Sequence, residues 1–200
     1  MPDLIETTLR SEQLIEGTYL KVFRDEVRLP DGATAVREWI KHPGGAAVVP
    51  LFEDGTTRLV RQYRYVPRRA LLEIPAGKAD YEGEDPEAVA ARELEEEIGW
   101  RAGRLVRLGV FHPCIGYSDE CIHVFLALDL VKVEQRLDQG EFLEIVTMPF
   151  DEAVARARRG DLLDMKTVVA LLLAEQPGKG EREQGGEEDE GSFEKNTGDG

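Results

Sequence analysis

The sequence predicts an α+β fold, because a series of short strand-like runs is combined with only a few helical ones. The strand-like runs are rich in β-branched and other apolar residues, and glycine, proline and aspartate separate them. The chain has 200 residues, enough for one domain with a sizeable hydrophobic core, and no internal repeat is visible.

Two strands are expected near the N-terminus, at Tyr19–Val27 and Thr34–Lys41. They flank the turn signal Leu29-Pro30-Asp31-Gly32, which predicts an antiparallel hairpin. Further strands are expected at Ala46–Leu51, Arg58–Tyr65, Leu105–Phe111, His123–Leu130 and Glu144–Pro149.

The clearest helix signal starts at Asp85, which can accept hydrogen bonds from the first free amides, with Pro86 at the first helical position. Gly99 can end this helix in a left-handed conformation. We expect the apolar residues at helical spacing to form its buried stripe: Ala91, Leu94 and Ile98.

Two further helices are expected at Asp151–Arg159 and Leu162–Glu175, with Gly160 between them. The second is expected to pack on the core through its apolar residues at helical spacing, Leu163, Val168, Leu171 and Leu172.

The formal charge of −15 is concentrated in two segments. Residues 176–200 hold eight carboxylates, three basic residues and seven glycines, so we expect a disordered acidic tail there. Residues 80–97 hold nine carboxylates and a single basic residue, Arg92. Such an acidic chain is not expected to bind nucleic acid through surface charge.

Neither a targeting segment nor a membrane span is expected, because the N-terminus lacks a basic start with an apolar run and no window is apolar enough. The two cysteines, Cys114 and Cys121, have the spacing of neither a zinc site nor a disulfide scaffold. These features favour a cytoplasmic location.

Three glutamates of the first helix, Glu93, Glu96 and Glu97, lie at i, i+3 and i+4, so their carboxylates converge on one face. A hard divalent cation would offset their repulsion, whereas a solvated charged face is the alternative. The neighbours favour the cation site: Arg92 can orient Glu96, and the turn Glu73-Ile74-Pro75-Ala76-Gly77 can direct carbonyls at the same ion.

This segment resembles the conserved box of the Nudix hydrolases: Gly, five residues, Glu, seven residues, then Arg-Glu-U-x-Glu-Glu-x-Gly-U, where U is aliphatic or aromatic. Glu84, the seven residues after it, and the run from Arg92 to Trp100 match in full. Gly77 is separated from Glu84 by six residues rather than five, and the intervening loop should absorb the extra residue.

The resemblance implies a Nudix-type α/β/α sandwich with a mixed sheet, which hydrolyses a nucleoside diphosphate linked to another group. It also implies one to three Mg²⁺ or Mn²⁺ ions, with Glu93 and Glu97 as principal ligands, Glu96 as a further one, and the carbonyl of Ala76 completing the set. Glu96 and Arg92 would assist catalysis. Metal dependence should be absolute, because the carboxylates would otherwise repel an anionic substrate.

Outside the box, the chain is similar to the ADP-ribose pyrophosphatase branch in Val60–Tyr65, Glu73–Gly77 and Gly116–Glu120. This similarity implies that Arg64 contacts the diphosphate, with Arg61 in support, and that Glu73 and Gly77 border the substrate. Ile115 stands where the branch usually has proline, which leaves GDP-mannose and other nucleoside diphosphate sugars open as substrates.

The branch also implies a general base on a late loop, for which Glu141 is the candidate and Glu144 the rival. Its first strands cross between subunits, so a C2 homodimer is expected. Trp39 is then either an interface residue or a core residue.

We therefore expect an N-terminal β region at residues 1–45, a hydrolase domain at 46–175 and the acidic tail at 176–200. The expected substrate is ADP-ribose or a relative, cut to AMP and ribose 5-phosphate with Mg²⁺. Two alternatives stay open: a house-cleaning nucleoside triphosphate pyrophosphohydrolase, and a non-catalytic nucleotide sensor.

Overall fold

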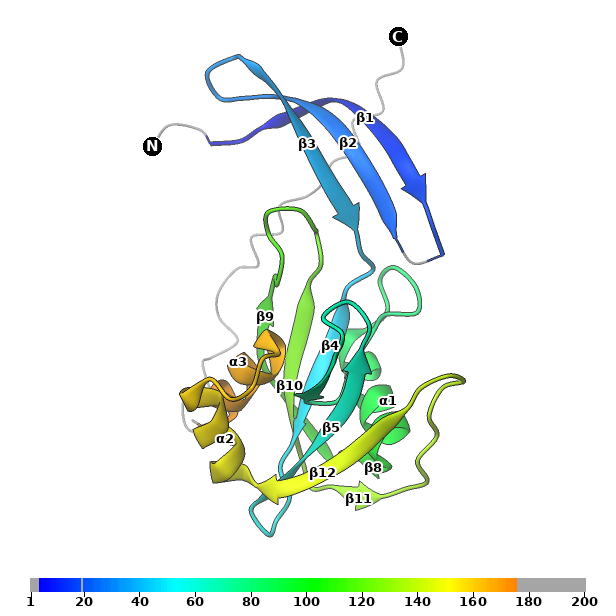
Figure 1. The fold of residues 1–200 in the computed structure, drawn as a ribbon, viewed down its shortest axis with the longest axis vertical. Helices are drawn as coiled ribbons and strands as arrows, with labels where there is room; N and C mark the ends of the chain where they lie inside the picture. Colours follow the sequence, from blue (N-terminus) through cyan, green and yellow to red (C-terminus); the bar gives the residue numbers. More distant parts are fainter. Residues whose placement is uncertain (1–3, 19, 176–200) are drawn as a thin grey trace.

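The structure is a computed structural model that describes residues 4–18 and 20–175. Tyr19, the expected start of the first strand, and the expected tail at 176–200 lie outside the described residues. Figure 1 shows a three-stranded N-terminal sheet set apart from a body of sheets and helices.

The N-terminal sheet is antiparallel, in the order β1 (Thr7–Glu16), β2 (Lys21–Arg28) and β3 (Thr34–Lys41). The predicted hairpin is confirmed as β2 and β3, which pair from Arg28↔Thr34 to Lys21↔Lys41. β1 was not predicted. Every residue of β1 is exposed and its register is interrupted twice, so it lacks the alternation that marks a half-buried strand.

The body contains a mixed four-stranded sheet in the order β7 (Ala76–Lys78), β4 (Gly45–Pro50), β10 (Ile122–Leu128) and β9 (Arg104–Phe111). β4 and β10 run parallel, and the other pairs are antiparallel. A second, antiparallel sheet has the order β12 (Leu143–Pro149), β5 (Thr56–Arg64) and β6 (Arg69–Glu73). A short pair is formed by β8 (Trp100–Arg101) and β11 (Val131–Lys132).

The predicted strands of the body are confirmed within a few residues as β4, β5, β9, β10 and β12. Strands β6, β7, β8 and β11 were missed, since each has only two to five residues and cannot show a clear alternation. One of these, β7, borders the site described below.

Helix α1 (Pro86–Ile98) is capped as predicted. The side chain of Asp85 accepts from the amide of Glu87, and Gly99, at φ 70°, donates its amide to the carbonyls of Leu94 and Glu95. The predicted buried stripe is wrong in one member, because Ala90 is fully buried and Ala91 only partly.

Helices α2 (Phe150–Arg159) and α3 (Met165–Ala174) confirm the two predicted C-terminal helices, with Gly160 closing α2. α3 begins three residues later than predicted, because Asp164 caps it by accepting from the amide of Thr167. Leu171 is fully buried, whereas Leu163 is 61% exposed and lies before the helix.

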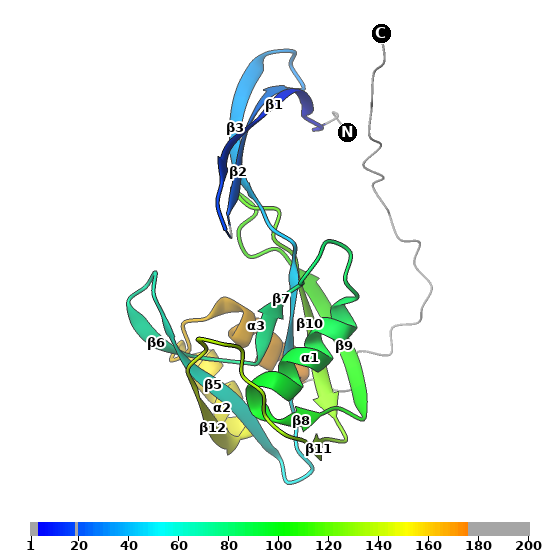
Figure 2. The ribbon, with the colours of Figure 1, turned by 90° about the vertical axis from the view of Figure 1, so that its right-hand side faces the viewer.

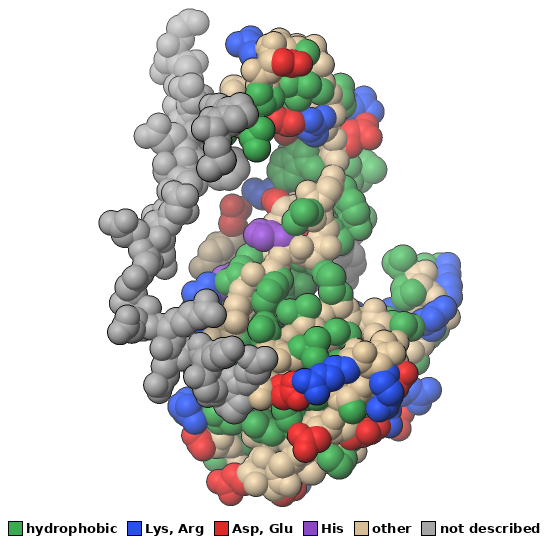
Figure 3. Space-filling view, turned by 90° about the vertical axis from the view of Figure 1, so that its left-hand side faces the viewer, with side chains coloured by type: hydrophobic (Ala, Val, Ile, Leu, Met, Phe, Trp, Pro, Cys, Tyr) green, Lys and Arg blue, Asp and Glu red, His purple; other side chains and the backbone are tan. Residues whose placement is uncertain are grey.

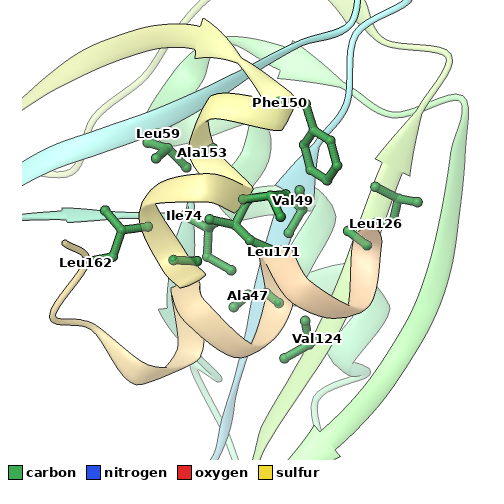
Figure 4. Packing of buried hydrophobic residues seen from close by; sticks show 14 of the residues in the cluster. Ala47, Val49, Leu59, Ile74, Val124, Leu126, Phe150, Ala153, Leu162 and Leu171 are labelled. Atoms are coloured by element: carbon green, nitrogen blue, oxygen red, sulfur yellow. The ribbon is translucent and has the colours of Figure 1, made fainter. Parts of the chain in front are cut away.

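The layers are held together by β4, whose alternate side chains enter two different cores. Ala47 and Val49 pack with Leu171, Phe150 and other residues of α2 and α3, as Figure 4 shows. Ala46 and Val48 pack with Leu94 of α1 instead. Figure 2 shows α1 on one side of the strands and α2 and α3 behind them, which agrees with the expected α/β/α layering.

The N-terminal sheet joins the body through the three residues between β3 and β4, His42, Pro43 and Gly44. A parallel bridge between Ile40 and Ser118 and a hydrogen bond from the His42 amide to Asp119 Oδ1 (2.7 Å) fix this junction. Within the described residues, no helix is both long and apolar enough to cross a membrane.

Candidate active site

A cavity of about 470 Å³ lies where α1, β7, β5 and the start of α3 meet. Five of the residues expected to form the site line it, namely Arg64, Ala76, Gly77, Glu97 and Glu141. The cavity therefore joins carboxylates from a helix and a loop to a guanidinium from a strand.

Glu93 and Glu97 lie one turn apart on α1 and are both buried, with exposed fractions of 9% and 4%. Burial raises the pKa of Glu93 to about 7, against the charge of Arg92. Burial and then the charge of Glu93 raise the pKa of Glu97 to about 8. A positive charge bound beside Glu93 and Glu97 is therefore more favourable than two ionised carboxylates without one.

The backbone of β7 makes room for these carboxylates because position 77 is a glycine. A Cβ atom there would lie 2.0 Å from Oε1 of Glu93, so no other residue fits without displacing that carboxylate. The amide of Ala76 donates to Oε2 of Glu97 at 3.2 Å. Of the predicted residues, Ala76 therefore contacts Glu97, and Gly77 lies against Glu93.

Arg92 lies beside the carboxylates and holds several of them. Its Nη1 is 2.8 Å from Glu93 Oε1 and 3.6 Å from Glu96 Oε2, and its Nη2 is 3.5 Å from Glu84 Oε2. The predicted pairing with Glu96 is present, but the contact with Glu93 is shorter. Glu96 is the more exposed of the three clustered glutamates, and neither it nor Arg92 lines the cavity.

Of the two candidate bases, Glu141 and Glu144, only Glu141 is among the residues that line the cavity. Glu141 lines the cavity and adds to the negative potential at Glu93 and Glu97. Glu144 is exposed on β12 and accepts from Arg61, with Nη1 3.0 Å from Oε2. Arg61 is thus paired away from the cavity that Arg64 lines, because residues three apart on a strand face opposite sides.

Glu73 is 2% exposed and lies behind Arg64 instead of lining the cavity. Arg64 donates to it through Nε at 2.7 Å and Nη2 at 2.8 Å. The structure therefore brings together all the predicted site residues except Arg61, with Glu73, Glu93, Glu96 and Arg92 forming the surroundings of the cavity.

Several residues that line the cavity were not predicted: His42, Gln62, Glu120, Asp164 and Lys166. Gln62 could have been found, since it is two residues before Arg64 and shares its face of the strand. The others come from segments far apart in the sequence, and only the tertiary fold brings them to one place.

The buried carboxylates of Glu93 and Glu97 fit a hard divalent cation, because such ions prefer oxygen ligands. Among the described residues, no three Asp, Glu, His or Cys side chains are close enough to hold a metal ion by themselves. Glu93, Glu97 and the Ala76 carbonyl would hold such an ion together with water or substrate oxygens.

Comparison with known proteins agrees with this chemistry. A family model described as the NUDIX domain matches residues 41–172, and one described as the nucleoside diphosphate sugar hydrolase N-terminal domain matches residues 6–40. An ADP-ribose pyrophosphatase of Bacillus subtilis (strain 168) is 38% identical over 173 residues, covering 86% of this chain and 93% of the relative.

A second ADP-ribose pyrophosphatase, from Mycobacterium tuberculosis (strain ATCC 25618 / H37Rv), is 35% identical over 167 residues, which cover 82% of this chain and 81% of that protein. Among solved structures, one titled "Crystal structure of ADP compounds hydrolase" aligns with a TM-score of 0.75. It covers 86% of this chain and 92% of its own at 24% identity, so it supports the fold.

The raised pKa of Glu97 leads to a stability prediction for the metal-free protein. A carboxyl whose pKa is 4.5 when unfolded and about 8 when folded destabilises the fold increasingly as the pH rises between these values. Glu97→Gln removes this cost and keeps the acceptor for the Ala76 amide. The variant should match the wild type below pH 4.5 and exceed its unfolding free energy by on the order of 4 kcal/mol at pH 9.

Urea unfolding at several pH values in the presence of a chelator measures this difference. The control is Glu53→Gln, at an exposed position in the turn after β4, which should leave the pH dependence unchanged. A Glu97→Gln variant less stable than the wild type at pH 9 would contradict the prediction.

Proposed function

The chain belongs to the Nudix family of hydrolases, and on that premise we propose that its preferred substrate is ADP-ribose or a close relative. The protein hydrolyses the pyrophosphate bond of nucleoside diphosphate sugars. From ADP-ribose the products are AMP and ribose 5-phosphate. The names of the two pyrophosphatase relatives support ADP-ribose in particular.

The single observation that carries this proposal is one cavity lined by both the guanidinium of Arg64 and the buried carboxylate of Glu97, which lies one helical turn from buried Glu93. A diphosphate needs positive charge on its oxygens, and Arg64 offers a planar guanidinium for this purpose. The carboxylates alone would repel the substrate, so Glu93 and Glu97 would need to hold divalent cations that offset this negative charge.

Nudix hydrolases generally need divalent metal ions, and we propose Mg²⁺ here, with Mn²⁺ as a substitute. Held by Glu93 and Glu97, such ions would neutralise charge on the diphosphate and activate a water molecule. Glu141 accepts the proton of the attacking water on its carboxylate. Arg92 keeps Glu93 and Glu96 oriented through the contacts described above.

The division into an N-terminal β region and a hydrolase domain stays our proposal, supported by the separate family matches at 6–40 and 41–172. The cytoplasmic location and the inert acidic tail also stay predictions. No observation favours the sensor or the triphosphate alternative over nucleoside diphosphate sugars.

We also propose that the N-terminal sheet forms a C2 homodimer. It carries apolar side chains that are exposed in the single chain, including Leu9 (42%), Ile15 (54%) and Val36 (58%). Figure 3 shows hydrophobic side chains among charged ones on this sheet. Trp39 is only partly buried, stacks on Phe23 and donates to Asp25 Oδ2 at 2.9 Å, so its contacts lie within its own sheet.

The activity is tested by incubating the protein with ADP-ribose and Mg²⁺ and following AMP. Turnover should stop when the metal is chelated and return when Mg²⁺ is restored. Glu97→Gln should lower kcat by several powers of ten while the protein stays folded. Absence of turnover with every nucleoside diphosphate sugar in a panel would refute the proposal, and release of inorganic pyrophosphate from triphosphates would favour the alternative enzyme.

The role of Glu141 is tested by a matched pair of variants on neighbouring positions. Glu141→Gln should lower kcat by about 10²–10⁴-fold, the usual contribution of a general base. Glu144→Gln, which loses only the exposed pair with Arg61, should stay within about threefold of the wild type. The reverse ranking would identify Glu144 as the base.

The dimer is tested by analytical ultracentrifugation at micromolar concentrations. The wild type should sediment as a dimer, and Ile15→Glu with Val36→Glu should shift it to a monomer that keeps its secondary structure. A wild type that is monomeric throughout this concentration range would rule out the proposed dimer.

A further inference from the structure

Lys166 is a cation of α3 that borders the cavity, although the sequence marked this helix only as a packing element. Its side chain is 15% exposed. Nζ lies 2.5 Å from Glu73 Oε2 and 3.0 Å from Asp164 Oδ2. The ammonium group is therefore held between two carboxylates at the edge of the site.

One buried carboxylate, Glu73, joins Lys166 to Arg64. Both of its oxygens accept from Arg64, and Oε2 also accepts from Lys166. Burial alone would raise the pKa of Glu73, but hydrogen bonds and charge from Arg64 and Lys166 outweigh it and hold the pKa below its ordinary value. Glu73 is thus a fixed negative charge shared by two cations.

The backbone around this network is also fixed. Asp164 Oδ2 accepts from the amide and the hydroxyl of Thr167, and the Thr167 hydroxyl accepts from the amide of Ile74 at 2.9 Å. Thr167 is fully buried. The first turn of α3 is therefore attached to the Glu73–Ile74 segment, and Lys166 has little freedom to leave Glu73.

We propose that Lys166 is a positioning residue for Arg64, acting through Glu73, and that it sets the affinity for the diphosphate of the substrate. This inference rests on the proposed function. Glu73 occupies Nε and Nη2 of Arg64, which leaves the N–H groups of Nη1 for a ligand in the cavity that Arg64 lines.

The charge of Lys166 determines how much of the positive charge of Arg64 is available to the diphosphate. With Lys166 present, the formal charges of the two cations, Arg64 and Lys166, equal those of the two carboxylates, Glu73 and Asp164. Without it, this group has one cation, Arg64, against the two carboxylates of Glu73 and Asp164, and an incompletely paired buried charge is costly. The positive charge of Arg64 then mainly compensates these two carboxylates and is less available to the diphosphate.

A double-mutant cycle tests this coupling, with Arg64→Met, Lys166→Met and the double variant assayed on ADP-ribose with Mg²⁺. Lys166→Met should raise KM about tenfold and change kcat less than threefold. The double variant should be no worse than Arg64→Met alone. Lys166→Arg should restore KM to within about threefold of the wild type, because it keeps the charge.

Two further variants separate positioning from general structural damage. Arg156→Met removes an ion pair of similar length with Glu152 on α2, away from the cavity, and should leave KM unchanged. Lys166→Gln gives the same KM readout should Lys166→Met fail to fold, as judged by circular dichroism.

An unchanged KM in the folded Lys166 variants overturns the proposal. So does a double variant whose change in KM, expressed as a free energy, equals the sum of the changes in Arg64→Met and Lys166→Met. A wild type without turnover on any nucleoside diphosphate sugar is instead a failure of the proposed function. In that case the same cycle, measured as calorimetric binding of inorganic pyrophosphate with Mg²⁺, still decides whether the two cations are coupled.

Discussion

Two carboxylates that the fold buries one helical turn apart, those of Glu93 and Glu97, set the conditions for everything around the cavity. Their desolvation and mutual repulsion oppose folding, and the neighbouring groups limit this cost. Gly77 lets the backbone approach Glu93, Arg92 pairs with Glu93, and the Ala76 amide donates to Glu97. A helix that would otherwise be only a charged surface element thus carries a buried pair of carboxylates beside the cavity.

Signals that lie within a few residues of each other could be read from the sequence. Asp85, Pro86 and Gly99 predicted α1 because caps act on the nearest amides and carbonyls. The box motif likewise indicated Glu93, Glu97 and Gly77 without any knowledge of the fold. The sequence could not show that Glu93 and Glu97 are buried more deeply than Glu96, because that depends on which strands α1 covers.

Other parts depended on contacts between distant segments. Lys166 meets Glu73 only because Asp164 caps α3 directly before Met165 and the first turn of the helix is attached to the Ile74 amide. Strand β1 shows no alternation because both its faces are exposed in the single chain. The assignment of Arg61 beside Arg64 could have been improved, since the period of two along a strand places these residues on opposite faces.

The short junction between the N-terminal sheet and the body gives the molecule a mechanical property. Only His42, Pro43 and Gly44 separate β3 from β4, and His42 also lines the cavity. The bridge from Ile40 to Ser118 and the hydrogen bond to Asp119 leave this junction little slack. Because this junction is short and held at two points, we expect His42, which lines the cavity, to move together with the N-terminal sheet.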